Sequence, residues 1–329
     1  MTKKISITVF MALLVCSCNQ TFEPNGSYED RMIVFSILRT ESDTQYVRVY
    51  ETYDPNLHNP LTHTTDTEIT DATVLVSDGT DTIAFHDTVI TRYDTTTLYG
   101  KYLHTYTAYH FVPKANTTYT LSISSPTKGN VSAHVSTFPS GAVYASNKIY
   151  QTLAAPQSSE ADTSIIVTVQ LSSEVPAYMV RLMLKYRQYV SGQWVLSLVE
   201  VPIEVVEGVS YNDYLPTYPS VMRRGQYATM YAGQERISFS KDAYIALVKN
   251  LKYTIGPSKI EFDGAYFILN QFDQNVYSYF SATNQVSDNI SIRLDQIDFS
   301  NIQGGYGLFG LSTHSESFYL KLPIDIDVQ

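Results

Sequence analysis

The sequence predicts a mainly β protein with two domains: an N-terminal antiparallel β-sandwich over residues 32–139 and a second β-rich domain with one or two short helices over residues 140–329. The chain holds 27 tyrosines and 14 phenylalanines, residues that favour strands. Its apolar residues fall in short runs separated by turn residues, at a spacing of about ten. A chain of 329 residues also exceeds what one hydrophobic core usually serves, which favours two domains.

The first eighteen residues are MTKKISITVFMALLVCSC, in which two lysines precede the apolar segment Ile5–Val15. As a helix this segment would span about 16 Å, less than a bilayer core of about 30 Å. Residues 1–17 are therefore typical of a cleaved signal of the bacterial lipoprotein type, with small Ser17 before the cleavage point and lipid on Cys18. Cys16 follows a bulky valine and suits cleavage less well, and an ordinary signal without lipid is the alternative.

Charge and cysteine content limit the possible partners. Residues 18–31 are polar and contain Pro24 and Gly26, which predicts a flexible tether. The formal charge is −10, and removing Lys3 and Lys4 with the signal leaves 20 basic against 32 acidic residues, or −12. This balance argues against nucleic acid and against basic patches on a membrane, so the lipid would be the anchor. With one cysteine cleaved off and the other lipidated, we expect no disulfide.

In the first domain, strands are expected at residues 32–38, 45–53, 105–113, 117–125 and 130–139. Asp78-Gly79 lies between two β-rich runs in residues 72–85 and predicts a hairpin. The intervening stretch 54–71 is polar. Together these runs predict a sandwich of about 110 residues.

In the second domain, strands are expected at 162–173, 177–190, 193–206 and 259–272, with Ser191-Gly192 as a turn. Residues 211–231 have no clear period and predict a long loop. Ser240 is expected to cap a helix over 240–251, and Asp273 to begin a second one. Segments 290–297 and 317–323 are expected to be closing strands.

Residues 300–310 read SNIQGGYGLFG and follow an aromatic segment with Tyr277, Tyr279 and Phe280. With the lipoprotein signal, the ATVLVSDG hairpin and the TTYTLSI strand, this stretch resembles a lipoprotein family known as domain of unknown function 4249. The resemblance implies an Ig-like, carboxypeptidase-regulatory-like first domain and transfers no active site. Because members are often encoded near TonB-dependent outer-membrane transporters, it also implies a role in uptake. Acidic residues are sparse directly after Cys18, which leaves the face of the membrane undecided.

The same stretch matches the spacing of a dinucleotide-binding fingerprint, but no helix follows it to receive a pyrophosphate, so we reject that function. Glycines lose more backbone entropy on folding than other residues, so something must require them. We expect a structural role in the second domain, with at least one glycine at positive φ and Phe309 buried. The residues assigned to this motif are Asn301, Gly304, Gly305, Gly307, Phe309 and Gly310.

The sequence shows no recognisable catalytic or metal-binding motif, and we expect no enzyme activity, no metal and no cofactor. The nearest approach to a ligand set lies in or beside the polar stretch and comprises Asp54, His58, His63, Asp66 and Asp71. Its spacing fits neither a calcium loop nor a zinc site, so a solvated loop is expected.

A tyrosine-rich region is the best candidate for ligand binding, because aromatic rings on loops can stack on sugars or hold peptides. It comprises Tyr211, Tyr214, Tyr218, Tyr227 and Tyr231, with Trp194 expected nearby. A chain with 27 tyrosines also places some together by chance, and half-buried tyrosines suit the surface of a sheet.

These observations favour a non-enzymatic lipoprotein of the outer membrane, acting as an accessory or ligand-binding subunit of a TonB-dependent transporter, with an unknown ligand. One alternative is a structural or adhesin subunit of a surface fibre, in which SFYLKLP near the C-terminus would be the donor strand. A second alternative is a hydrolase without a recognisable motif.

Overall fold

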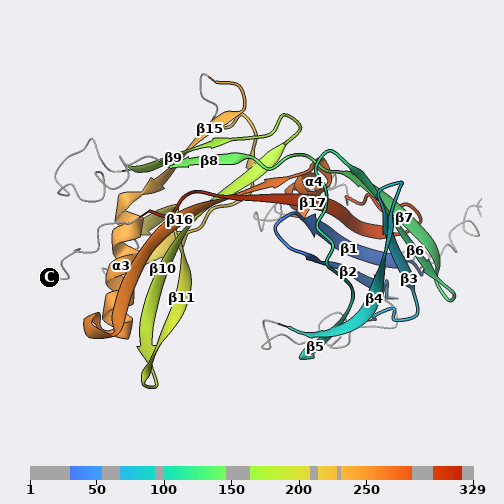
Figure 1. The fold of residues 1–329 in the computed structure, drawn as a ribbon, viewed down its shortest axis with the longest axis horizontal. Coiled ribbons are helices and arrows are strands. Elements are labelled where there is room, and N and C mark those ends of the chain that lie inside the picture. The colour runs from blue at the N-terminus through green and yellow to red at the C-terminus, as the bar shows by residue number, and fades with distance from the viewer. Residues whose placement is uncertain are drawn as a thin grey trace, which may run out of the picture.

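The computed structural model describes residues 30–53, 67–92, 100–145, 164–207, 214–227, 231–283 and 299–320. Within these ranges the chain is mainly β with two α-helices, as the sequence predicts. Figure 1 shows two lobes connected by the long strands β16 (Ile260–Phe272) and β17 (Tyr306–Glu316). No helix in the described ranges is long and apolar enough to cross a bilayer.

In most strands of the first lobe, such as β6, buried positions alternate with more exposed ones, so that one face of the strand packs on a core. The hairpin predicted at Asp78-Gly79 joins β3 to β4, and the Asp78 carboxylate closes it by accepting hydrogen bonds from the Thr80 and Asp81 amides at 3.0 and 2.7 Å. The strands are β1 (Met32–Arg39), β2 (Thr44–Glu51), β3 (Thr73–Ser77), β4 (Thr82–Thr91), β5 (Tyr102–Tyr109), β6 (Thr118–Ser125) and β7 (Gly129–Ser136).

The second lobe has the predicted β10–β11 hairpin, in which Ser191 and Gly192 both have positive φ, 49° and 89°. Ser240 caps α3 by accepting from the Ala243 amide at 3.3 Å. Its remaining elements are β8 (Ala142–Ala145), β9 (Ser164–Gln170), β10 (Ala177–Val190), β11 (Gln193–Val201), β12 (Glu204–Glu207), β13 (Tyr214–Thr217), β14 (Met222–Arg223), β15 (Gln234–Ser240), α3 (Lys241–Ile255), the 3₁₀ turn η2 (Pro257–Lys259) and α4 (Gln274–Thr283).

Three expectations need correction. The region 211–231 is not all loop, because it contains β13 and β14. The strand expected over 193–206 is divided into β11 and β12 around Pro202, which cannot donate a ladder hydrogen bond. Of the closing strand expected at 317–323, the described part is not a regular strand: Leu320 makes an isolated bridge to Ala265 of β16. The segment 290–297 lies outside the described residues.

Twelve strands form one sheet in the order β11-β10-β16-β17-β1-β2-β5-β4-β3-β6-β7, with β14 paired to β10. At its centre β17 runs parallel to β1 and antiparallel to β16. Smaller sheets are formed by β15-β9-β8 and by β12-β13. Because the large sheet continues through both lobes, the boundary at residues 139 and 140 stays a prediction.

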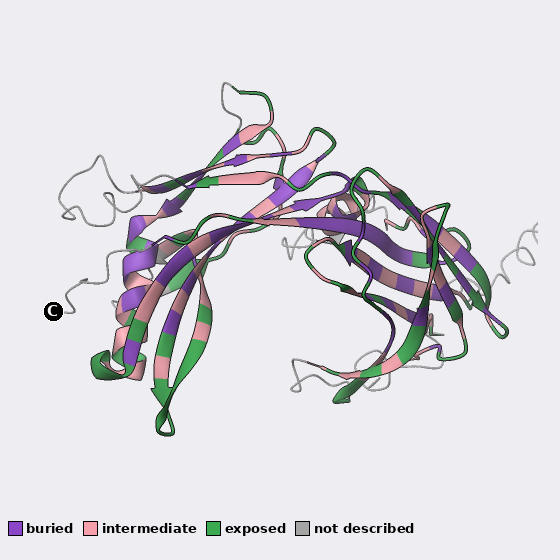
Figure 2. Cartoon of the chain, viewed as in Figure 1, coloured by how far each residue is buried: buried purple, intermediate pink, exposed green. Residues whose placement is uncertain are grey.

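The buried apolar residues form two large clusters and a smaller one (Figure 2). The first lies among β1 to β7 and includes Phe309 and Leu311 of β17. The second lies between α3, the β15-β9-β8 sheet and one face of β10 and β16. The third is where α4 packs through Val276 against the centre of the large sheet. The C-terminal third of the chain therefore contributes to every cluster.

Candidate functional site

The glycine-rich stretch forms the central strand β17 and its approach, and it builds the fold as expected. Gly304 and Gly307 have positive φ, 83° and 115°, and Phe309 is fully buried. A Cβ atom at Gly307 would overlap the Val34 carbonyl oxygen of β1. The expectation that this stretch serves the second domain needs correction, because β17 pairs with β1 as well as with β16, and Phe309 lies in the core of the first lobe.

The Asn301 side chain makes two hydrogen bonds with the backbone of β17, as a neighbouring strand would. Its amide group donates to the Phe309 carbonyl at 2.7 Å and accepts from the Phe309 amide at 2.9 Å. The buried Asp273 carboxylate accepts from the amides of Val276 and Leu311, both at 3.1 Å, and so joins the start of α4 to β17. Burial raises the pKa of Asp273, and these amide donors oppose that rise. The polar groups of Asn301 and Asp273 therefore satisfy buried backbone groups, which is a structural role.

The predicted aromatic residues lie in different places. The Trp194 ring meets Tyr189 edge-on, with ring centroids 5.4 Å apart, at the tip of the β10–β11 hairpin. Tyr227 and Tyr231 are exposed at the approach to β15, where the Tyr227 amide donates to the buried Glu235 carboxylate at 2.9 Å. Tyr218 follows β13 and lines a groove against α3. Tyr211 and the side chain of Tyr214 lie outside what the structure describes.

The groove between α3 and the β12–β13 pair is the best candidate for a ligand site among the described residues. It has a volume of about 460 Å³, within the range of small-molecule pockets. The helix presents positions three and four residues apart, which lie on one face. The lining residues are Pro202, Val205, Pro216, Tyr218, Ala243, Ala246, Leu247, Lys249, Asn250 and Tyr253.

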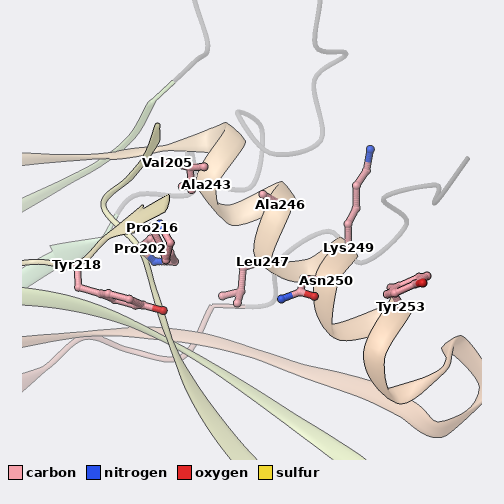
Figure 3. Close-up of a pocket in the computed structure, with 10 residues that line it drawn as sticks. All are labelled: Pro202, Val205, Pro216, Tyr218, Ala243, Ala246, Leu247, Lys249, Asn250 and Tyr253. Carbon is pink, nitrogen blue, oxygen red and sulfur yellow. The ribbon is translucent and has the colours of Figure 1, made fainter. Parts of the chain in front are cut away.

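The groove is apolar along its floor and polar at a few points. Figure 3 shows Tyr218 extending from the strand side toward Leu247 and Asn250 of α3, while Lys249 points away from them. Of the described lining residues, Lys249 is the one with a formal charge. The site can therefore bury an uncharged apolar molecule and offer a phenol and an amide as hydrogen-bonding groups. Sequence reasoning found Tyr218 but missed the α3 residues, although their helical spacing was visible from Ala243 to Tyr253.

The structure describes no group of three or more His, Cys, Asp and Glu residues that could hold a metal ion in its ranges. Asp71, from the candidate ligand set, accepts from the Ser125 and Thr127 hydroxyls at 2.9 and 3.1 Å. Its other members, Asp54, His58, His63 and Asp66, lie outside the described residues, as does Cys18. The absence of a metal and of catalysis stays a prediction.

A family model described as Domain of unknown function (DUF4249) matches residues 19–317, which include both lobes and the glycine-rich stretch. No curated protein matches the chain.

Proposed function

The chain belongs to the family described as Domain of unknown function (DUF4249), and from that premise we propose that it is a non-enzymatic lipoprotein of the outer membrane that captures an apolar ligand as an accessory subunit of a TonB-dependent transporter. The signal-like residues 1–18 support the lipid anchor on Cys18. The family resemblance supports the transporter, and the groove beside α3 carries the ligand-binding part.

The walls of the groove favour an uncharged ligand over an ion. Six of its ten lining residues are proline, valine, alanine or leucine, so a bound apolar molecule is stabilised by about 25 cal/mol for each Å² removed from water. Tyr218 and Asn250 can orient a polar group of that ligand without introducing charge. We expect selectivity for uncharged, partly aromatic or aliphatic molecules.

Photolabelling with benzophenone, a neutral apolar probe, tests this site in the full chain purified in detergent. We expect adducts on peptides from α3 and the β12–β13 pair. Ala246→Trp fills the groove and should reduce these adducts to background, whereas Tyr109→Ala, at an exposed tyrosine of the first lobe, should leave them unchanged. Labelling elsewhere, or equal labelling of Ala246→Trp, would remove the groove from the proposal.

The transporter is tested separately by mild cross-linking in native membranes, followed by mass spectrometry of purified complexes. A TonB-dependent transporter recovered with the wild-type chain, and lost when Cys18→Ala prevents anchoring, is the expected result. Recovery of the lipoprotein without any transporter would contradict that part of the proposal and leave the ligand result independent.

A further inference from the structure

The outer edge of β11 is bare and apolar. In the part of the chain that the structure describes, β11 pairs with β10 on one side and with nothing on the other. From Gln193 to Val199 it contains no charge, proline or glycine. Trp194, Leu196 and Leu198 are 42%, 55% and 52% exposed, and Figure 2 shows the exposed positions along this hairpin.

These exposed side chains lie on the face of the sheet opposite α3. Residues directly across an antiparallel ladder share a face, and here Tyr189 faces Trp194, Arg187 faces Leu196 and Lys185 faces Leu198. Leu184 and Val199 point to the other side, into the core that α3 covers. Away from its tip the hairpin therefore packs one face on this core and exposes apolar side chains on the other, and its outer row of backbone groups is unpaired among the described residues.

The charges on this part of the sheet cancel, although the whole chain is strongly acidic. The charged residues of β10, β11 and β16 are three basic and three acidic, which sum to zero. Arg181 pairs with Glu200 at 2.7 Å, and Arg187 pairs with Glu261 and Asp263 at 3.0 and 3.5 Å. A second acidic molecule would meet no net repulsion at this surface.

We propose that β11 pairs with β11 of a second copy of this chain, antiparallel about a two-fold axis near Ser197. In that register Leu196 lies opposite the partner's Leu198, and Val195 lies opposite the partner's Val199. In these two pairs apolar side chains meet apolar side chains, Trp194 lies opposite the partner's Glu200, and both rows of backbone groups gain hydrogen bonds. A two-fold interface needs such a self-complementary surface, and closed two-fold pairs are the commonest oligomers.

The pairing ends at two copies because, among the described residues, β11 is the edge strand of the large sheet that no other segment bridges. The other edge strand, β7, is bridged by Gln303 through two backbone hydrogen bonds with Ser132, at 2.7 and 3.1 Å. An open polymer through this sheet would need two free edges. The arrangement therefore favours a closed pair over the fibre that was one alternative from the sequence.

A single introduced cysteine tests the register. In the proposed pair the two Ser197 residues lie opposite each other, with Cα atoms about 4.5 to 5.5 Å apart, which a disulfide can bridge. Full-length Ser197→Cys, purified in detergent and mildly oxidised, should therefore form a covalent dimer. Ser258→Cys, an exposed position after α3, controls for chance collision, and the unchanged chain controls for Cys16 and Cys18. Equal cross-linking of the Ser197 and Ser258 variants would overturn the proposal.

Mass measurement by light scattering, corrected for detergent, tests the interface without oxidation. We expect two copies for the wild type and for Val89→Lys, which adds the same charge at a similarly exposed position of β4. Leu196→Lys should weaken association by about tenfold or more, because it places a charge inside an apolar strand pair. A one-copy wild type, a Leu196→Lys variant that still pairs, or a different protein held at this edge would each refute pairing of β11 with itself.

Discussion

The two edge strands of the twelve-stranded sheet differ in whether another described segment of the chain bonds to them. At β7 the strand alternates polar and apolar residues, shows its polar side to solvent, and receives Gln303 across its middle. At β11 apolar side chains are exposed on both sides of the hairpin tip, and no described segment follows the edge. Natural proteins usually protect the unpaired backbone groups of edge strands. The difference therefore indicates that the chain itself covers β7, whereas a partner covers β11.

The segment that finishes β7 is the same one that builds the centre of the sheet. Gln303 comes immediately before Gly304 and Gly305, and β17 begins at Tyr306. A Cβ atom at Gly304 would lie 2.9 Å from the Asn130 carbonyl oxygen of β7, so the chain passes close against that edge. The described C-terminal residues thus complete the first lobe, and none of their strands pairs with the outer edge of β11.

The largest loss of stability is expected from Gly307→Ala, in the segment that both builds the centre of the sheet and leads to its β7 edge. The new Cβ atom would overlap the Val34 carbonyl oxygen, and its backbone has a φ of 115° that side chains rarely adopt. We expect the free energy of unfolding to fall by roughly 4 kcal/mol or more, measured by urea denaturation. Gly192→Ala in the β10–β11 turn is the control, because its φ is also positive, 89°, but nothing lies near its Cβ position.

The control should lose only about 1 to 2 kcal/mol, the cost of a left-handed alanine. Equal losses at the two glycines would mean that the close approach of β1 and β17 has no special energetic role. The glycine stretch would then contribute no more to the free energy of unfolding than the turn of the β10–β11 hairpin does.

Local signals in the sequence were sufficient for much of the fold. Alternation along residues 177–190 found β10, and the side chains of Ser240 and Asp273 marked the starts of α3 and α4. Strand β17 was missed, because a central strand with a parallel neighbour is buried on both faces and shows no alternation. Its glycines, which the close packing requires, look like a loop when read along the chain.

The candidate site was less accessible to sequence reasoning. Tyr218 was singled out for its chemistry, yet its partners Ala246 and Leu247 lie on a helix nearly thirty positions away. Helical periodicity shows that a face is apolar but not which segment lies against it. Trp194 was expected near the tyrosines, whereas its ring packs on Tyr189 of the same hairpin.

An intermediate loss of stability is expected from Gln303→Pro, which removes a backbone hydrogen bond at the β7 edge. Proline lacks the amide hydrogen that Gln303 donates to the Ser132 carbonyl at 2.7 Å. We expect a loss of about 1 to 2 kcal/mol in the free energy of unfolding. With a second edge exposed, the protein should also form assemblies larger than two copies, which light scattering can detect.

Gln303→Ala is the matched control, because it removes the side chain and keeps the backbone amide. It should retain the wild-type mass and nearly the wild-type stability. If the alanine variant assembles as the proline variant does, the side chain rather than the backbone bridge protects β7, and the contrast between the two edges has a different cause.

The smallest loss of stability is expected at Lys128, in the turn between β6 and β7. Its ammonium group links this end of β7 to the start of the described chain. It pairs with Asp30 at 2.5 Å and with Glu51. The hydrogen bond to Asp30, then that to Glu51, raises the pKa of Lys128 above its ordinary value of 10.5. The resulting stability is fully present below pH 10.5 and is lost as the pH rises through the higher folded-state pKa.

Lys128→Met keeps most of the apolar stem and removes the charge. The side chains of Lys128, Asp30 and Glu51 are 24%, 42% and 30% exposed, so solvent screens the pairs and the loss at pH 7 should stay below about 1 kcal/mol. In about 1 M salt the difference from wild type should nearly vanish, because the Debye length falls to about 3 Å. Lys249→Met, which removes the same charge from α3, should show no such salt dependence in urea denaturation. A loss at Lys128 that is independent of salt would mean that packing of the lysine stem, rather than the ion pairs, secures this end of the covered edge.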